Sequence, residues 1–334
     1  MRVYVTRKLP DEVAGILTPF FEVESWPHED VPVSRSALLS GVETADGLVR
    51  LLTDRIDRSV LDGARRLKIV ANVAVGFDNV DVGACTERGI AVTNTPGVLT
   101  ESTADLAFAL LLAAARRIPE AQDALKRFEW KAWSLMFLTG RDVHSATLGI
   151  VGMGRIGRAV ARRAAGFSMR ILYYSRRRDA EIEGETGAVF RPLDELLRES
   201  DFVSIHLPLT EETRHLIGER ELSLMKPTSV LVNTSRGPVV DEAALCHALE
   251  RRTIWAAGLD VYEEEPLPAQ SPLRSLDNVV LLPHIGSATV TTRTRMASMA
   301  AENVREFLLR GKALTPVNPE VLALRRAIEQ PNAD

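Results

Sequence analysis

Short apolar, β-branched segments alternate with helical patterns along most of this 334-residue chain, and this alternation restricts the fold more than any other feature. Neighbouring parallel strands need a long crossover connection, which a helix supplies. The alternation therefore predicts an α/β protein with two doubly wound parallel sheets covered by helices. The strand-like segments of a first series are RVYVT, DGLVRLL, KIVANV and IAVTN, and those of a second series are ATLGIVG, RILYY, DFVSIHLP, SVLVNTS, AAGLDV and NVVLLPH.

The second series is long enough to form a domain of its own, from residue 101 to residue 285. A long amphipathic pattern and a short strand-like segment, ALTPV, follow it. These are too little for a third domain, so we expect them to return to the first one. The predicted domains are residues 1–100 with 286–334, which form one discontinuous domain, and residues 101–285.

The composition is that of an ordinary soluble globular protein, with 46% apolar and 26% charged residues. A net charge of −4 and a pI near 6.0 give no general attraction to nucleic acid or to an anionic membrane. The longest apolar run, residues 106–115, is too short to span a bilayer, and the N-terminus lacks the apolar core of a signal peptide. The two cysteines, Cys85 and Cys246, show no metal-ligand spacing. We therefore expect a cytoplasmic protein without a metal site.

A glycine motif lies in the segment GIVGMGRIGRAV, where Gly152, Gly154 and Gly157 have the spacing G-x-G-x-x-G. The first glycine permits a tight turn, the second lets a pyrophosphate approach the backbone, and the third allows close packing of helix on strand. A predicted strand at 147–151 precedes the motif and a predicted helix at 155–165 follows it, so the helix N-terminus faces the anion. This context predicts a dinucleotide-binding Rossmann domain.

An arginine cluster follows the next predicted strand, residues 170–174. NAD-binding domains usually place a carboxylate there, about 20 residues beyond the glycine motif, where it binds the ribose hydroxyls. This chain has Ser175 followed by three arginines. Serine and arginine hydrogen-bond a 2′-phosphate, which a carboxylate would repel. We therefore expect NADPH as the cofactor, bound by Ser175, Arg176 and Arg177. The alternative is a solvated turn in which Asp179 neutralises one guanidinium and NADH serves as well.

The segment 101–117 is apolar nearly all round a helix, which predicts burial on every side. Such a helix lies between domains or between subunits. The apolar pattern at 106–118 therefore predicts a homodimer.

Three segments with polar residues follow predicted strands of the second series: LVNTSRGPVVD, GLDVYEEEP and LLPHIGSAT. In an open parallel sheet the ligand lies beyond the carboxyl ends of the strands, so residues directly after strands reach it. These segments supply an arginine, acidic residues and a histidine.

Taken together, the motifs resemble the D-isomer-specific 2-hydroxyacid dehydrogenase family, and most closely its glyoxylate and hydroxypyruvate reductase branch. The resemblance covers nearly the whole chain. It rests on VGFDNVD, GIAVTNTPGVLTESTADLAFALLLAAARR, the glycine motif, NTSRG and PHIGSAT. It implies a Rossmann NAD(P)-binding domain inserted in a flavodoxin-like substrate domain.

The resemblance also implies the catalytic residues. Arg236 would bind the substrate carboxylate and 2-oxo oxygen, His284 would donate the proton, and Glu265 would pair with the histidine. The chemistry agrees, because hydride transfer to a ketone leaves negative charge on oxygen, which a guanidinium stabilises and an imidazolium protonates. An adjacent carboxylate would hold the histidine protonated at neutral pH. Glu263 and Glu264, in the same acidic run, are expected to be surface residues.

Further residues are implied around the cofactor and the substrate. The cofactor wall would comprise Gly152, Met153, Gly154, Arg155, Ile156, Gly157, Thr234, Ser235, Asp260 and Gly286, with Asp260 near the nicotinamide amide. The backbone amides of Val75 and Gly76 would bind the substrate carboxylate. Leu51, Trp133 and Met136 would shape a small apolar pocket, with ordinary packing as the alternative for Trp133 and Met136.

The resulting hypothesis is an NADPH-preferring reductase of small 2-oxoacids, which converts glyoxylate to glycolate and hydroxypyruvate to D-glycerate. Two alternatives within the family are phosphoglycerate dehydrogenase and phosphite dehydrogenase. The chain shows no extra basic cluster for a substrate phosphate, and it has Val75 where the phosphite enzymes place a lysine. A third alternative is a dinucleotide-sensing, corepressor-like binding protein, because the fold alone does not determine function.

Overall fold

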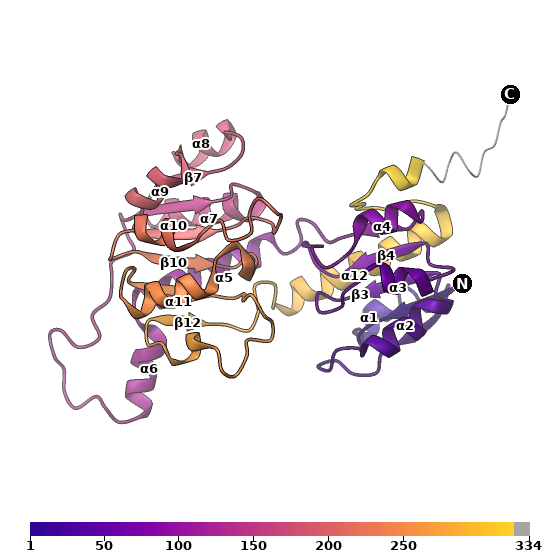
Figure 1. Ribbon diagram of the computed structural model, residues 1–334, viewed down its shortest axis with the longest axis horizontal. Coiled ribbons are helices and arrows are strands. Elements are labelled where there is room, and N and C mark those ends of the chain that lie inside the picture. Colours follow the sequence, from indigo (N-terminus) through magenta and orange to yellow (C-terminus); the bar gives the residue numbers. More distant parts are fainter. Residues whose placement is uncertain (324–334) are drawn as a thin grey trace. The chain divides into compact units, whose positions relative to one another are not determined.

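Two parallel sheets organise the protein in a computed structural model that describes residues 1–323 (Figure 1). The chain separates into one unit of Met1–Leu99 with the segment from Thr289 onward, and a second unit of Thr100–Ala288. The last eleven residues of the predicted discontinuous domain lie outside the described part of the chain. The second unit is thus inserted into the first, and the predicted fold class, two parallel-sheet α/β domains, is confirmed.

The first unit contains a five-stranded sheet with the strand order β2-β1-β3-β4-β5, in which all neighbours are parallel. This 2-1-3-4-5 order is the flavodoxin-like one. The strands are β1 (Arg2–Val5), β2 (Glu22–Ser25), β3 (Gly47–Arg50), β4 (Ile69–Asn72) and β5 (Ala91–Thr93). The helices are α1 (Asp11–Ala14), α2 (Arg35–Thr44), α3 (Arg58–Gly63), α4 (Val82–Glu87) and α12 (Val290–Arg310).

Both faces of this sheet are buried, because side chains along each strand alternate between two hydrophobic cores. Val3 and Val5 belong to the core that includes α1 and α12, whereas Tyr4 belongs to the core that includes α2, α3 and α4. The returning helix α12 buries Ala297, Ala300, Ala301, Val304 and Phe307, which recur at helical spacing. Its amphipathic pattern therefore completes the first unit.

The prediction of a strand-like segment at ALTPV is wrong. In its place the structure has a single antiparallel bridge between Thr93 and Pro316. Proline has no N–H group to donate, so it cannot extend a ladder of hydrogen bonds at that position.

The second unit contains a seven-stranded parallel sheet with the order β12-β11-β10-β9-β6-β7-β8. The order reverses between β6 and β9, as in a Rossmann domain. The strands are β6 (Thr147–Val151), β7 (Arg170–Tyr174), β8 (Val189–Phe190), β9 (Phe202–Ile205), β10 (Val230–Asn233), β11 (Ala256–Leu259) and β12 (Val279–Leu281). The α-helices are α5 (Thr100–Ala115), α6 (Ile118–Lys126), α7 (Arg155–Gly166), α8 (Ala180–Thr186), α9 (Leu193–Glu199), α10 (Glu219–Leu224) and α11 (Glu242–Glu250). Two 3₁₀ turns, η1 (Gly237–Val239) and η2 (Pro272–Ser275), complete the unit.

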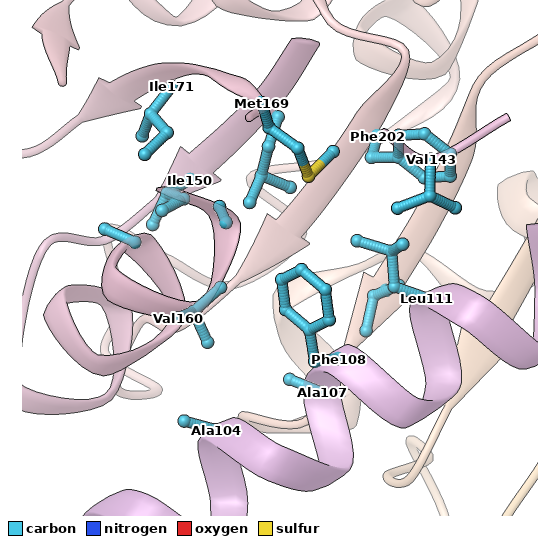
Figure 2. Packing of buried hydrophobic residues seen from close by; sticks show 14 of the residues in the cluster. Ala104, Ala107, Phe108, Leu111, Val143, Ile150, Val160, Met169, Ile171 and Phe202 are labelled. Carbon is cyan, nitrogen blue, oxygen red and sulfur yellow. The ribbon is translucent and has the colours of Figure 1, made fainter. Parts of the chain in front are cut away.

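Helix α5 supplies much of one core of this unit. Figure 2 shows the side chains of Phe108 and Leu111 projecting from α5 towards Val143, Met169 and Phe202, all of which are buried. The same cluster includes Ile150 of β6, Val160 of α7 and Ile171 of β7. This packing holds α5 and α7 against the same face of the sheet.

The prediction that a helix at 101–117 is buried on every side is wrong for the single chain. Glu101, Asp105 and Ala109 are exposed along one face of α5. Arg163 of α7 lies across the first turns of that face, 2.9 Å from the Glu101 carboxylate and 2.6 Å from that of Asp105. The helix also ends earlier than the apolar pattern does, because Arg117 adopts a left-handed backbone conformation with φ of 52°.

Candidate active site

The glycine motif has the predicted geometry at the end of β6 and the start of α7. Gly152 has φ of 106°, and a Cβ there would lie 2.7 Å from the carbonyl oxygen of His206. A Cβ on Gly157 would collide with the carbonyl oxygen of Gly152. Gly154, in contrast, has no atom within 4 Å of its Cβ position. The first and third glycines are therefore required by packing, and the second leaves the open approach that a pyrophosphate needs.

The residues around this loop also suit a dinucleotide. Helix α7 begins directly after Gly154, so its N-terminal amides face the open side of the loop. Met153 is buried in the core, whereas Arg155 is exposed and Ile156 is half-buried. The hydroxyl of Thr234, after β10, is buried without a hydrogen-bond partner in the described part of the chain. Such an orphan hydroxyl is typical of a ligand site.

The three arginines after β7 differ in their partners. Arg178 pairs with Glu183 at 2.9 Å, and Asp179 pairs with Arg158 of α7 at 2.6 Å. Within the described residues, Arg176 and Arg177 form no ion pair of this kind. The pKa of Glu212 is lowered mainly by a hydrogen bond with Thr210, and the charge of Arg176 adds to this effect. The sequence left open that Asp179 neutralises one of these three arginines. In the structure Asp179 pairs with Arg158 instead.

The Ser175 hydroxyl donates a hydrogen bond to the carbonyl of Arg177 and so shapes the turn. Ser175, Arg176 and Arg177 thus form a surface turn in which both guanidiniums are exposed. This geometry is compatible with phosphate binding.

A loop after β10 presents Arg236. The Asn233 side chain donates to the carbonyl of Arg236 at 2.9 Å and accepts from the N–H of Ser235 at 3.0 Å and from its hydroxyl at 2.8 Å. Gly237 packs so closely on the backbone of Tyr262 that a Cβ would overlap it. The loop that carries Arg236 is therefore fixed against the loop that leads to Glu265.

The predicted acid and histidine meet. The Nδ1 of His284 lies 2.7 Å from Oε2 of Glu265, while Oε1 of Glu265 accepts from the N–H of Tyr262 at 3.1 Å. His284 has φ of 52°, a conformation that costs a non-glycine residue about 1–3 kcal/mol. The surrounding contacts hold it there, as is usual where orientation of a side chain matters.

Asp260 holds the backbone directly after His284. Its side chain is 1% exposed, and its two carboxylate oxygens accept from the N–H groups of Ile285 and Gly286, each at 2.7 Å. The carbonyl of Gly286 accepts from the hydroxyl of Thr103 at 3.2 Å. Burial raises the pKa of Asp260, and the two N–H groups oppose this effect. Asp260 thus fixes the loop that begins at His284.

Two residues near this edge of the sheet had no distinguishing signal in the sequence. Glu263, which was expected to be a surface residue, is exposed, and its carboxylate lies 2.7 Å from Nε2 of His215. His206 follows β9 and backs the glycine loop with its carbonyl group. Although part of His206 reaches the surface, its Nδ1 is buried without a partner in the described chain, and burial lowers its pKa to about 4. Only its place directly after a strand could have marked His206.

The predicted substrate loop lies in the first unit, after β4. Val75 and Gly76 are half-buried, and so is Leu51, which follows β3. Trp133 and Met136 lie in the second unit between α6 and β6, where they are 79% and 72% exposed. The structure does not bring these last two residues against Arg236 or His284 within the second unit.

A cavity of about 500 Å³ opens elsewhere on the second unit. It lies at the amino ends of β11 and β12, where Arg141 is stacked over Trp255 at 4.5 Å. None of the predicted site residues lines it, so it has no part in the site at the carboxyl ends. In the part of the chain that the structure describes, no group of His, Cys, Asp or Glu could hold a metal ion, and no helix is suited to crossing a membrane.

Known proteins resemble this chain over nearly its whole length. A glyoxylate reductase of Korarchaeum cryptofilum is 54% identical over 325 residues, covering 97% of this chain and 98% of the relative. One of Thermococcus gammatolerans is 54% identical over 329 residues, with 97% and 98% covered. Among solved structures, a glyoxylate reductase from Paecilomyes thermophila has a TM-score of 0.86 at 34% identity, covering 95% of this chain and 99% of that one.

An NADPH-dependent glyoxylate/hydroxypyruvate reductase of Sinorhizobium meliloti, solved with NADP and malonate, has a TM-score of 0.82 at 36% identity. It covers 95% of this chain and 96% of its own. Residues 108–286 match the family model described as D-isomer specific 2-hydroxyacid dehydrogenase, NAD binding domain. With its Rossmann sheet, glycine motif and paired histidine and glutamate, the chain belongs to the D-isomer-specific 2-hydroxyacid dehydrogenase family and is an NAD(P)-dependent oxidoreductase.

Proposed function

We propose that this enzyme is an NADPH-preferring reductase of small 2-oxoacids, which reduces glyoxylate to glycolate and hydroxypyruvate to D-glycerate. The observation that carries the proposal is the pair of His284 and Glu265 beside the loop of Arg236, all at the carboxyl ends of neighbouring strands. The relatives of Korarchaeum and Thermococcus, at 54% identity, support glyoxylate as the substrate.

The catalytic residues divide the work of ketone reduction. A nicotinamide cofactor, when bound, would supply the hydride that reduces the carbonyl carbon of the substrate. His284 then donates a proton to the carbonyl oxygen, on which negative charge develops. The hydrogen bond from Nδ1 of His284 to Glu265 leaves Nε2 as the nitrogen that delivers this proton. Glu265 therefore sets the tautomer and the orientation of the ring, as the carboxylate does in a catalytic triad.

Arg236 stabilises the charge on the oxygen and binds the substrate carboxylate, since a guanidinium provides a fork of donors for both groups. We assign the N–H groups of Val75 and Gly76 to the same carboxylate. The first unit is then the substrate domain, and Leu51, Trp133 and Met136 form the apolar wall that favours small substrates. Asp260 fixes the loop after His284. We also assign it a place near the nicotinamide amide.

The cofactor preference rests on the turn after β7. The loop of Gly152, Gly154 and Gly157 would hold the pyrophosphate, with the open approach at Gly154, and Ser175, Arg176 and Arg177 would bind the 2′-phosphate. Two guanidiniums that form no ion pair in the described structure can each form charge-assisted hydrogen bonds, worth about 1.5–3 kcal/mol. The Sinorhizobium relative, which is described as NADPH-dependent and was solved with NADP, supports this preference.

We also propose that the enzyme is a homodimer. Its apolar side chains at the surface concentrate between α6 and β6, and soluble monomers rarely leave so many together in water. Those not assigned to the substrate pocket are Phe128, Trp130, Leu135 and Phe137, all 45–83% exposed. Sedimentation velocity checks this directly. A single species of about 73 kDa, twice the chain mass of 36.7 kDa, is expected, and a monomer at micromolar concentration would disprove the dimer.

The decisive experiment for the function is the initial rate of NADPH or NADH oxidation, measured with glyoxylate and then with hydroxypyruvate at subsaturating cofactor. Rapid turnover with a strong NADPH preference is the expected result. Turnover with NADH alone would keep the reductase and disprove the role of the arginines. No turnover with either cofactor across several 2-oxoacids would contradict the proposal and favour a dinucleotide-binding sensor.

A further inference from the structure

Two asparagine side chains hold the loop that follows β4. Asn72 is the last residue of β4 and is fully buried. Its Nδ2 donates to the carbonyl oxygen of Ala74 at 3.3 Å and to that of Gly76 at 2.6 Å. Asn94, which follows β5, donates from its Nδ2 to the carbonyl oxygen of Val75 at 2.8 Å. Three consecutive carbonyl groups therefore accept hydrogen bonds from two side-chain amides.

These hydrogen bonds also fix the direction of the backbone N–H groups. The carbonyl and the N–H of one peptide unit lie in a plane and point in opposite directions. The carbonyl of Ala74 shares its peptide unit with the N–H of Val75, and that of Val75 shares its unit with the N–H of Gly76. When the asparagines hold the carbonyls, both N–H groups point away from them. In the described part of the chain, neither N–H group donates a hydrogen bond to the protein.

A side-chain amide suits this task. The NH₂ group of an amide has two donors, and Asn72 uses both on the loop. An aspartate would place oxygen lone pairs against the carbonyl oxygens. A leucine would leave the Gly76 carbonyl without its side-chain donor, whereas the Ala74 carbonyl would keep its hydrogen bond from the N–H of Thr95 at 3.0 Å. Either change would remove the hydrogen bond that holds the Gly76 carbonyl and would loosen this end of the loop.

Asn94 is itself held from the other end of the first unit. Its N–H donates to the carbonyl of Thr315 at 3.3 Å, and its carbonyl accepts from the Thr315 hydroxyl at 2.6 Å. The buried side chain of Asn303, on α12, accepts from the N–H of Thr315 at 3.0 Å. A continuous series of hydrogen bonds thus links the returning helix α12 to the peptide of Val75. The segment after the inserted domain therefore contributes to the geometry of this loop.

We propose that Asn72 and Asn94 are positioning residues, which hold the N–H groups of Val75 and Gly76 in the orientation that binds the carboxylate of the 2-oxoacid. The inference rests on the proposed function, because that function assigns the two N–H groups to the carboxylate. The carboxylate is bound equally before and during hydride transfer, so a poorly held loop weakens binding of the substrate and leaves the chemical step nearly unchanged.

The test compares Asn94→Leu with a matched control, Asn318→Leu. Asn318 is a buried asparagine of the same unit that also bonds backbone groups, since it accepts from Val92 and donates to Ile90. Its bonds lie away from the 74–76 loop. For Asn94→Leu we expect a rise of about tenfold in KM for glyoxylate, with kcat within about twofold and KM for the cofactor unchanged. Asn318→Leu should lower the melting temperature without changing KM for glyoxylate.

Three outcomes would overturn the inference: an unchanged KM in Asn94→Leu, an equal rise in the Asn318→Leu control, or a loss confined to kcat. Asn94→Gln, which keeps the amide donor on a longer side chain, should recover part of the affinity for glyoxylate. No recovery, combined with a normal melting temperature, would also count against a positioning role.

A second measurement uses the unmutated protein and does not depend on turnover. Oxamate, an unreactive analogue of a 2-oxoacid, is titrated in the presence of the cofactor while the backbone amide resonances are followed. The resonances of Val75 and Gly76 should shift on binding, and oxamate should bind Asn94→Leu about tenfold more weakly. If oxamate binds in this way but no 2-oxoacid is reduced, the proposed function fails and the positioning role stands. If the two resonances do not move, the positioning role fails even for an active reductase.

Discussion

The Nδ1 of His284 lies 2.7 Å from the Oε2 of Glu265, although the two residues are 19 positions apart in the sequence. They meet because β11 and β12 are parallel neighbours, so the segments that follow these strands lie at the same edge of the sheet. Replacing His284 by Ala should lower kcat by a factor of about 10²–10⁴ while KM for the cofactor stays unchanged, because only the proton donor is lost. Steady-state kinetics with glyoxylate checks this. Near-normal turnover would disprove the acid role of His284.

The arginine turn gives a prediction with its own matched control. Arg176→Ala should raise KM for NADPH at least tenfold and leave KM for NADH unchanged, because only the 2′-phosphate contact is removed. Arg178→Ala removes a neighbouring guanidinium that already pairs with Glu183, so it should change the NADPH to NADH ratio little. If Arg176→Ala changed KM for NADPH and for NADH equally, the arginines would have no role in binding the 2′-phosphate.

The glycine motif predicts two different defects. Gly157→Ala should lower the melting temperature, because the new Cβ would collide with the carbonyl of Gly152. Gly154→Ala has open space for its Cβ, so it should keep the melting temperature and raise KM for the cofactor about tenfold or more. Thermal unfolding and cofactor kinetics on both variants separate the two roles. A strongly destabilised Gly154→Ala would contradict this reading of the loop.

The variant Asp260→Asn distinguishes between two roles of Asp260. If it fixes the loop after His284, Asp260→Asn should lower kcat by a factor of about 10–100, because an asparagine can accept from only one of the two N–H groups and the imidazole is misplaced. If its main contact is with the nicotinamide amide, KM for the cofactor should rise instead while kcat is retained. Kinetics at saturating glyoxylate distinguishes these outcomes.

His206 gives a prediction for pH. Burial lowers its pKa from 6.5 to about 4, so the folded protein binds this proton less readily than the unfolded chain. The neutral ring therefore contributes stability above pH 6.5 that is lost as the pH falls from 6.5 towards 4. Between pH 7.5 and pH 5 the unmutated protein should lose about 2 kcal/mol more free energy of unfolding than His206→Asn, which does not titrate. Urea denaturation at both pH values checks this, and equal losses would disprove it.

Local patterns in the sequence predict a large part of this architecture. The alternation of strands and helices predicts two parallel-sheet domains, and the strand orders confirm this fold class. The glycine spacing predicts a loop in which Gly152 and Gly157 are sterically required. These features are local, because periodicity and backbone conformation depend on residues that are close in the sequence.

Other expectations fail where tertiary packing competes with a local pattern. The apolar segment 101–117 predicts one helix that is buried all round, but Arg163 covers an exposed, acidic face of α5 and the chain turns at Arg117. A helical period cannot show which neighbour lies across a face. The strand expected at ALTPV is lost because Pro316 lacks the N–H that a ladder needs.

By itself, the sequence determined the class of fold, the position of the glycine loop and the types of residue that follow each strand, because these depend on short-range spacing. The tertiary structure alone decided the partners. Asp179 could have neutralised either neighbouring arginine, yet it pairs with Arg158 on α7, and Asp260 binds the two N–H groups that follow His284. Each polar group has several candidate partners along the chain, and the order of the strands and the docking of the helices determine which one lies within hydrogen-bonding distance.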